Sequence, residues 1–179
     1  MANTFLLLNN INIGTSLVEK DLLLVAKKIL EKAKNYNCNF ILPIDVVCAD
    51  SLKNSKNIKQ CKVNNILPNQ MILDVGGETI DLIETILLRS KMILWNGPLG
   101  AFEYEPFNHA TNEIANKIKK NSNILNLKTL AGGGDTISAI KMAKAESAFS
   151  YISTSGGAFL EWLEGKESPG VKALKENKF

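Results

Sequence analysis

A glycine-rich stretch between an apolar run and a helical pattern is the part of this sequence best suited to chemistry. Residues 130–136 read Leu-Ala-Gly-Gly-Gly-Asp-Thr, and Ile137, Ile140 and Ala143 follow at helical spacing. This pattern predicts a strand, a tight turn and the first turn of a helix over residues 137–144. Because glycines let backbone N–H groups approach a ligand, and because a helix start carries partial positive charge, the expected guest is an anion, most often phosphate.

Asp135 does not suit a bare anion site, so its role has two interpretations. It could cap the helix that follows. It could instead hold a metal ion that accompanies a polyphosphate. The spacing alone does not decide between them.

Composition narrows the class of protein. At 179 residues the chain fits one domain or a fragment of a larger one, and 45% hydrophobic residues are enough for a core. A net charge of +3, with scattered lysines, does not favour a nucleic-acid partner. We find no apolar run of membrane-spanning length, no signal-peptide pattern and no metal-like spacing among the three cysteines. We therefore expect a cytoplasmic protein without a nucleic-acid or membrane partner.

Hydrophobic periodicity places helices and strands in alternation. Ser16 and Glu19 have the spacing of a capping box ahead of the first helix. Residues 1–8 are apolar without an assigned element, and residues 51–57 are expected to form a loop. Helices are expected at residues 17–34, 79–88, 107–119, 137–144 and 156–163, and strands at 40–43, 46–49, 60–63, 71–73, 92–95, 124–130 and 149–153, with a short tail helix after Pro169-Gly170.

This alternation predicts an α/β fold with a mainly parallel sheet flanked by helices, of the Rossmann-like kind. In such folds ligands bind where loops leave the carboxyl ends of the strands. Three loops would then share one edge of the sheet: residues 96–103, 132–136 and 154–157.

The motifs restrict the ligand. The sequence holds neither a Walker-type phosphate loop nor a dinucleotide fingerprint. Two glycine-opened helices in tandem suit several phosphoryl oxygens, or a phosphoryl group in transfer. Asn96 offers an amide, and Glu103 offers an acceptor for ribose hydroxyls unless it is only a solvated loop carboxylate. His109 is expected at the surface, and both tryptophans, Trp95 and Trp162, in the core or at its margin.

Three stretches carry a resemblance to a known family: MILWNGPLGAFEYEPF over residues 92–107, LAGGGDT over 130–136, and FSYISTSGGAFLEWLEGKESPGVKAL over 149–174. Together with SLVEKDLLLVAKKILEKAK and ILPIDVVCAD upstream, they closely resemble phosphoglycerate kinase. The resemblance implies reversible phosphoryl transfer in glycolysis, from 1,3-bisphosphoglycerate to Mg-ADP, giving 3-phosphoglycerate and ATP. It also implies that residues 1–179 are an incomplete C-terminal nucleotide-binding domain.

The same resemblance assigns roles to residues. Backbone groups of Gly133, Gly156 and Gly157 would position the transferred phosphoryl group. Asp135 would hold the Mg²⁺ that accompanies ADP or ATP, and Glu103 would bind the ribose. The full nucleotide-binding set would be Asn96, Glu103, Gly132, Gly133, Gly134, Asp135 and Thr136.

The resemblance further implies that the N-terminal substrate domain is absent. The phosphoglycerate substrates would then bind only if a separate N-terminal fragment complemented this chain, and the isolated chain is expected to be inactive. Four positions, Ile72, Gly77, Ser155 and Phe159, depart from the family pattern near the expected nucleotide site. The alternatives are a non-catalytic nucleotide-binding or partner-binding module, or a remnant of a decayed gene.

Overall fold

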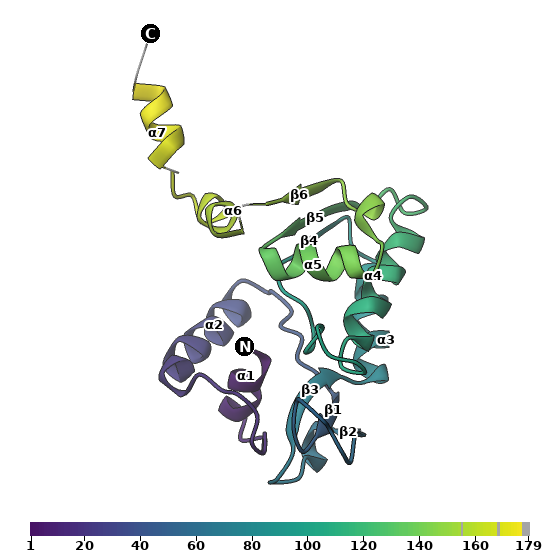
Figure 1. Ribbon diagram of the computed structural model, residues 1–179. Helices are drawn as coiled ribbons and strands as arrows, with labels where there is room; N and C mark the ends of the chain where they lie inside the picture. The colour runs from purple at the N-terminus through teal and green to yellow at the C-terminus, as the bar shows by residue number, and fades with distance from the viewer. Residues whose placement is uncertain (155, 168, 177–179) are drawn as a thin grey trace. The chain divides into compact units, whose positions relative to one another are not determined.

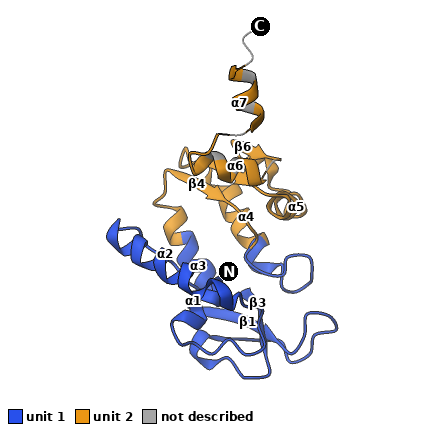
Figure 2. Ribbon diagram, turned by 90° about the vertical axis from the view of Figure 1, so that its left-hand side faces the viewer, with its two compact units in different colours: residues 1–84, 99–111 blue, residues 85–98, 112–179 orange. Residues whose placement is uncertain are grey.

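The computed structural model describes residues 1–154, 156–167 and 169–176, and these residues form two compact units. The first unit contains Met1–Glu84 and Leu99–Thr111, and the second contains Thr85–Pro98 and Asn112–Phe179 (Figure 2). Each unit has its own three-stranded sheet. The α/β class is confirmed, but the expectation of one mainly parallel sheet is wrong, because only one of the two sheets is parallel.

The first unit begins with two helices that pack on one another, α1 (Ala2–Leu8) and α2 (Leu23–Asn35) (Figure 1). The predicted start of α2 is wrong. A short 3₁₀ turn, η1 (Lys20–Leu22), precedes it, and its N-cap, Leu22, makes no side-chain capping bond. Ser16 caps nothing: its hydroxyl donates to the carbonyl of Ile13 and accepts from the backbone N–H of Ile72 at 2.8 Å.

The sheet of the first unit is antiparallel throughout, in the order β2-β1-β3. The short connection from β1 to β2, residues 50–58, explains why these two strands pair antiparallel, because a parallel pair would need a long crossover. Strands β2 and β3 flank β1 and run in the same direction, and the segment between them holds a 3₁₀ turn, η2 (Val63–Asn65). Residues 40–43, predicted as a strand, form none. The strands are β1 (Asp45–Ala49), β2 (Lys59–Lys62) and β3 (Met71–Val75).

A small apolar core holds this sheet together. Val46, Cys48 and Ile66 are buried, and Ile72 packs against them. Helix α3 (Gly77–Leu87) begins directly after β3. Gly77 is its first residue, and a Cβ there would meet only the Gln60 side chain, at 3.8 Å.

The sheet of the second unit is parallel, in the order β4-β5-β6, as predicted for this half of the chain. Helix α4 lies between the first two strands in sequence and α5 between the last two, because parallel strands need a long crossover connection (Figure 1). The elements are β4 (Met92–Trp95), α4 (His109–Asn121), β5 (Lys128–Gly132), α5 (Gly134–Met142), η3 (Glu146–Ala148), β6 (Tyr151–Ser153), α6 (Gly156–Leu163) and α7 (Pro169–Glu176).

The core of the second unit is aromatic and aliphatic. The rings of Trp95 and Phe149 have centroids 6.1 Å apart, and Ile118 and Ile140 are fully buried. The core position predicted for Trp95 is confirmed, whereas the Trp162 side chain lies outside the described part. None of the described helices is long and apolar enough to cross a membrane.

Candidate functional site

The three strands of the parallel sheet end at one edge, which we call the carboxyl edge. Because β4, β5 and β6 run in the same direction, the residues that follow each strand are neighbours in space. The loop starts predicted to converge, residues 96–98, 132–136 and 154–157 (residue 155 being outside the described part), leave the sheet at this edge. Residues 99–103 belong to the other unit.

Helix α5 begins at this edge with a glycine in an unusual conformation. Gly133 is its N-cap with a φ of 96°, a region that L side chains rarely adopt. The first helical hydrogen bond runs from the N–H of Ile137 to the carbonyl of Gly133. The amides of the first turn therefore have no partner within the helix. No side chain caps α5, so the interpretation of Asp135 as the cap is wrong, and Asp135 lies exposed in the first turn.

The loop after β4 is fastened to the start of α5. The buried Thr136 accepts a hydrogen bond on Oγ1 from the backbone N–H of Gly97 at 2.7 Å. The indole Nε1 of Trp95 donates to the Gly97 carbonyl at 2.6 Å, so the Gly97 residue is held at both ends. The side-chain Oδ1 of Asn96 lies 3.3 Å from where a Cβ on Gly133 would stand.

The start of α6 touches the start of α5. A Cβ on Gly156 would lie 2.6 Å from the Cα and 2.9 Å from the backbone nitrogen of Gly133. Both distances are too short for a Cβ, so any residue other than glycine would clash there. By contrast, nothing lies within 4 Å of where a Cβ would stand on Gly134 or Gly157. The two helix starts thus meet through glycine backbone, with open space beside them. Of the two family departures in this region, Ser155 and the Phe159 side chain lie outside the described part.

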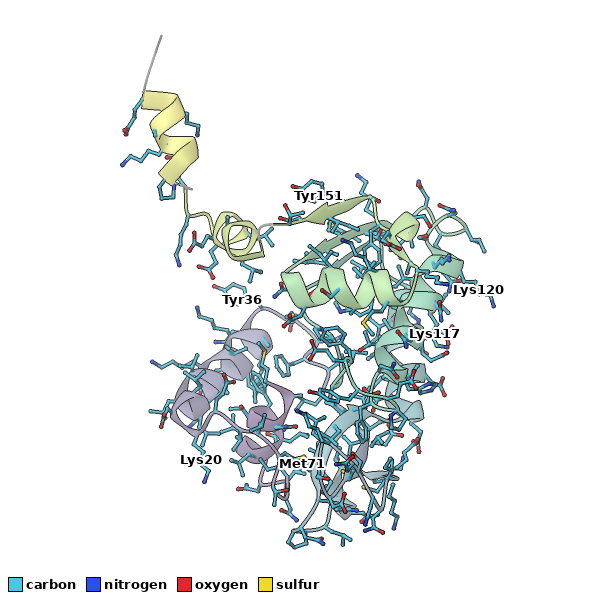
Figure 3. The ribbon with its side chains drawn as sticks, in the orientation of Figure 1. Lys20, Tyr36, Met71, Lys117, Lys120 and Tyr151 are labelled. Atoms are coloured by element: carbon cyan, nitrogen blue, oxygen red, sulfur yellow. The ribbon has the colours of Figure 1, made fainter. Side chains whose placement is uncertain are left out.

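This arrangement suits an anion. Two helix starts bring unpaired amides and partial positive charge to one place. Lys117 and Lys120 of α4 lie at the opposite end of the unit, because α4 ends where β5 begins (Figure 3). Lys119 likewise donates to the carbonyl of Lys144 beyond the end of α5. These three lysines therefore do not line the carboxyl edge, where glycine backbone offers amide donors.

A metal ion could be held there only with help from its ligand. Within the described residues, no group of three or more His, Cys, Asp or Glu side chains could hold a metal ion. The exposed carboxylate of Asp135 offers oxygen, the donor that Mg²⁺ prefers, and Mg²⁺ is commonly held by one or two carboxylates plus phosphate oxygens. Asp135 beside open backbone amides fits that arrangement.

The structure therefore brings together Asn96, Gly133, Thr136 and Gly156 at the carboxyl edge, with Gly132 buried as the last residue of β5. Glu103 is exposed and lies in the first unit, so its contact with a ribose stays a prediction.

Sequence reasoning missed two buried carboxylates in the first unit. The first, Asp45 of β1, caps α3 from a neighbouring strand: its carboxylate accepts from the N–H of Thr79 at 2.8 Å and from the N–H of Glu78 at 3.1 Å. The Thr79 hydroxyl and the Gln60 amide also donate to it. Burial raises the pKa of Asp45, but these hydrogen bonds outweigh it and hold the pKa below the ordinary 3.8. A Cβ on Gly76 would lie 2.2 Å from this carboxylate, so only glycine fits there.

The second, Asp74 of β3, holds the start of α4, the helix that follows the loop with Glu103. Its carboxylate accepts from the N–H of Ala110 and of Val75, each at 2.9 Å. Burial raises the pKa of Asp74 to about 6, although these bonds and the nearby His109 lower it. His109 itself is exposed, as predicted. The signal in the sequence was a carboxylate inside an apolar strand, which must find buried partners.

Comparison with known proteins points to one family. The profile of the family described as phosphoglycerate kinase matches residues 1–166. A phosphoglycerate kinase of Cereibacter sphaeroides is 47% identical over 174 residues, which are 97% of this chain and 44% of the relative. One of Xanthobacter autotrophicus is 46% identical over 175 residues, or 98% of this chain and 44% of the relative.

Solved structures give the same result. The phosphoglycerate kinase of Coxiella burnetii superposes with a TM-score of 0.89 at 38% identity, covering 98% of this chain and 44% of that chain. The phosphoglycerate kinase of Pyrococcus horikoshii OT3 superposes with a TM-score of 0.76 at 26% identity, covering 97% of this chain and 43% of that chain. The chain thus spans about 44% of the length of the relatives it matches. On this agreement of profile, sequence and structure, the chain belongs to the phosphoglycerate kinase family.

Proposed function

We propose that the carboxyl edge of the β4-β5-β6 sheet binds the phosphates of a magnesium nucleotide, ADP or ATP. The chain would then be an incomplete C-terminal nucleotide-binding domain, Rossmann-like in its parallel part. The observation that carries the proposal is the contact of Gly156 with Gly133, because it joins two helix starts into one field of backbone donors.

Each residue at this edge has a role in the proposal. The amides of Gly134 and Asp135 donate to phosphate oxygens, and those of Gly156 and Gly157 point at the transferred phosphoryl group. Asn96 adds a side-chain amide beside Gly133. The Thr136 hydroxyl holds the loop after β4 in place through Gly97.

Asp135 would hold Mg²⁺ together with phosphate oxygens, and when bound the ion neutralises charge on those oxygens. Glu103 would accept hydrogen bonds from the ribose hydroxyls. Phosphoryl transfer relies mostly on positioning and charge stabilisation, which backbone amides supply without reorganisation.

The reaction proposed for the complete fold is reversible transfer between 1,3-bisphosphoglycerate and ADP, giving 3-phosphoglycerate and ATP. Both phosphoglycerates would bind to the part of the family fold that this chain does not span. A separate fragment supplying that part would complement this chain. By itself the chain binds nucleotide but does not turn over.

Calorimetry with Mg-ADP tests the proposal. We expect saturable binding that weakens about tenfold in Asp135→Ala, the loss of about one charge-assisted contact. The matched control is Glu146→Ala, which removes an exposed carboxylate of the same unit, from η3, and should leave affinity unchanged. No heat at millimolar Mg-ADP, from a chain shown to be folded by circular dichroism, would refute nucleotide binding.

A coupled assay tests the reaction separately. We expect ATP formation from 1,3-bisphosphoglycerate only when the remaining part of the Cereibacter sphaeroides relative is added as a fragment. Saturable Mg-ADP binding without ATP formation in that mixture would favour the non-catalytic nucleotide-binding module instead.

A further inference from the structure

The loop after β4 carries a sequence known for chemical instability in proteins generally. Asn96 is followed by Gly97, and this is the only Asn-Gly pair in the chain. In such a pair the backbone nitrogen of the glycine can attack the asparagine side chain, because glycine has no Cβ to obstruct the approach. Asn96 is exposed, and nothing lies within 4 Å of where a Cβ on Gly97 would stand. Neither burial of Asn96 nor a neighbouring group beside Gly97 therefore protects the pair from this reaction.

One hydrogen bond does oppose the reaction. The attack requires that the Gly97 nitrogen lose its proton to a base in the solvent. That proton is donated to Oγ1 of Thr136 at 2.7 Å, and Thr136 is only 1% exposed. The Gly97 carbonyl is held in turn by the indole of Trp95 at 2.6 Å. The backbone N–H of Gly97 is thus hydrogen-bonded, and its orientation is fixed.

We propose that Asn96 is a spontaneous deamidation site at the carboxyl edge, and that the hydrogen bond from Gly97 to Thr136 sets its rate. The step balances with water as the co-reactant. The deprotonated Gly97 nitrogen forms a bond to Cγ of Asn96, and the Cγ–Nδ2 bond breaks, releasing ammonia and leaving a cyclic succinimide. Water then opens the ring at either carbonyl, which leaves an aspartate or an isoaspartate at position 96.

The product changes the charge of the site. Oδ1 of Asn96 lies 3.3 Å from where a Cβ on Gly133 would stand, beside the N-cap of α5. A carboxylate in that position would be attracted to the same helix start that the proposed function assigns to phosphate. Deamidation would therefore place a competing anion in the site, a consequence that rests on the proposed nucleotide binding, whereas the deamidation itself does not.

The test compares deamidation rates in three folded proteins at alkaline pH. Peptide mass spectrometry measures the conversion of the peptide that contains Asn96, and an isoaspartate-specific methyltransferase identifies the rearranged product. We expect Thr136→Val to convert about fivefold faster than the unchanged chain, the factor that corresponds to one typical hydrogen bond. Thr136→Ser, which keeps the hydroxyl, should convert at the unchanged rate.

Equal rates in the Val variant and the unchanged chain would overturn the proposal, as would a Ser variant as fast as the Val variant. Asn126, which precedes a leucine, is the internal control and should not change between variants. If Thr136→Val fails to fold, hydrogen exchange on the unchanged chain decides: a Gly97 amide that exchanges as fast as an unstructured one contradicts the proposal, and a protected amide supports it. None of these readouts involves nucleotide, so a failure here leaves the proposed function standing.

Discussion

The two sheets of this chain place their polar groups differently. In the antiparallel sheet, the carboxylates of Asp45 and Asp74 are buried and accept hydrogen bonds from the starts of α3 and α4, respectively. In the parallel sheet, the carboxyl edge is built from glycine backbone, and the carboxylate of Asp135 is exposed. The starts of the helices beside the antiparallel sheet already have carboxylate partners within the protein. The helix starts at the carboxyl edge of the parallel sheet are open to a ligand. The difference separates a stabilising region, the antiparallel sheet, from the region proposed to bind the nucleotide, the carboxyl edge.

The largest effect, a loss of stability, should come from removing the buried carboxylate of Asp45 in the antiparallel sheet. Asp45→Ala leaves the amides of Glu78 and Thr79 without an acceptor, at a cost of about 3 to 4 kcal/mol in the free energy of unfolding. Urea denaturation measures it. Asp21→Ala, which removes an exposed carboxylate, should change the free energy by less than about 0.5 kcal/mol. A small loss in the Asp45 variant would mean that the buried cap is dispensable.

Gly156→Ala should disrupt the contact between the starts of α5 and α6 at the carboxyl edge. Its methyl group would meet the backbone of Gly133 at 2.6 Å, and backbone cannot move aside as a flexible side chain can. We expect overpacking of about 2 to 3 kcal/mol and at least a tenfold loss of Mg-ADP affinity. Gly157→Ala is the matched variant, because nothing lies near its Cβ position. Equal affinity in both variants would contradict a site built on that contact.

The pH dependence of unfolding sharpens the contrast between the two buried carboxylates. The pKa of Asp45 is lowered, so its stabilising contribution is present above pH 3.8 and is lost as the pH falls through its folded pKa. The pKa of Asp74 is raised from 3.8 to about 6, so stability is lost as the pH rises between these values. The slope from Asp74 is at most about 1.4 kcal/mol per pH unit. Asp74→Asn should flatten the decline toward pH 6 in denaturation curves, and an unchanged slope would refute the assignment.

The smallest effect concerns charge at the carboxyl edge. Asn96→Asp imitates the deamidated site and should weaken Mg-ADP binding about fivefold, because a carboxylate competes for the start of α5. Asn96→Ser, which stays neutral, should lose less. Calorimetry that found Asp as good as Asn at this position would show that the amide does not lie near the bound phosphates.

The proposed binding region is more predictable from sequence than the stabilising one. The pattern predicts β4 at residues 92–95 and α6 at residues 156–163, both with the bounds observed. Of the predicted loops, residues 96–98 and 132–136 lie at the carboxyl edge, whereas residues 99–103 belong to the other unit. This worked because parallel strands joined by helices leave strong periodic patterns and place their loops at one edge.

The stabilising region was harder because its order comes from tertiary partners. The antiparallel pairing of β1 with β2 could be inferred from a connection, residues 50–58, that is too short for a crossover helix. The roles of Asp45 and Asp74 could not, since they depend on amides at Thr79 and Ala110, over thirty residues away in sequence. The capping-box prediction failed for the same reason: Ser16 binds Ile72 instead.

The central claim is that the two glycine-opened helix starts of the second unit receive the nucleotide phosphates. Amide resonances of isotope-labelled protein during a Mg-ADP titration test it most directly. We expect saturable shifts of the Gly134, Asp135, Gly156 and Gly157 amides, larger than those of α4 amides near Lys120. Shifts confined to other residues, or none at millimolar Mg-ADP, would contradict the claim.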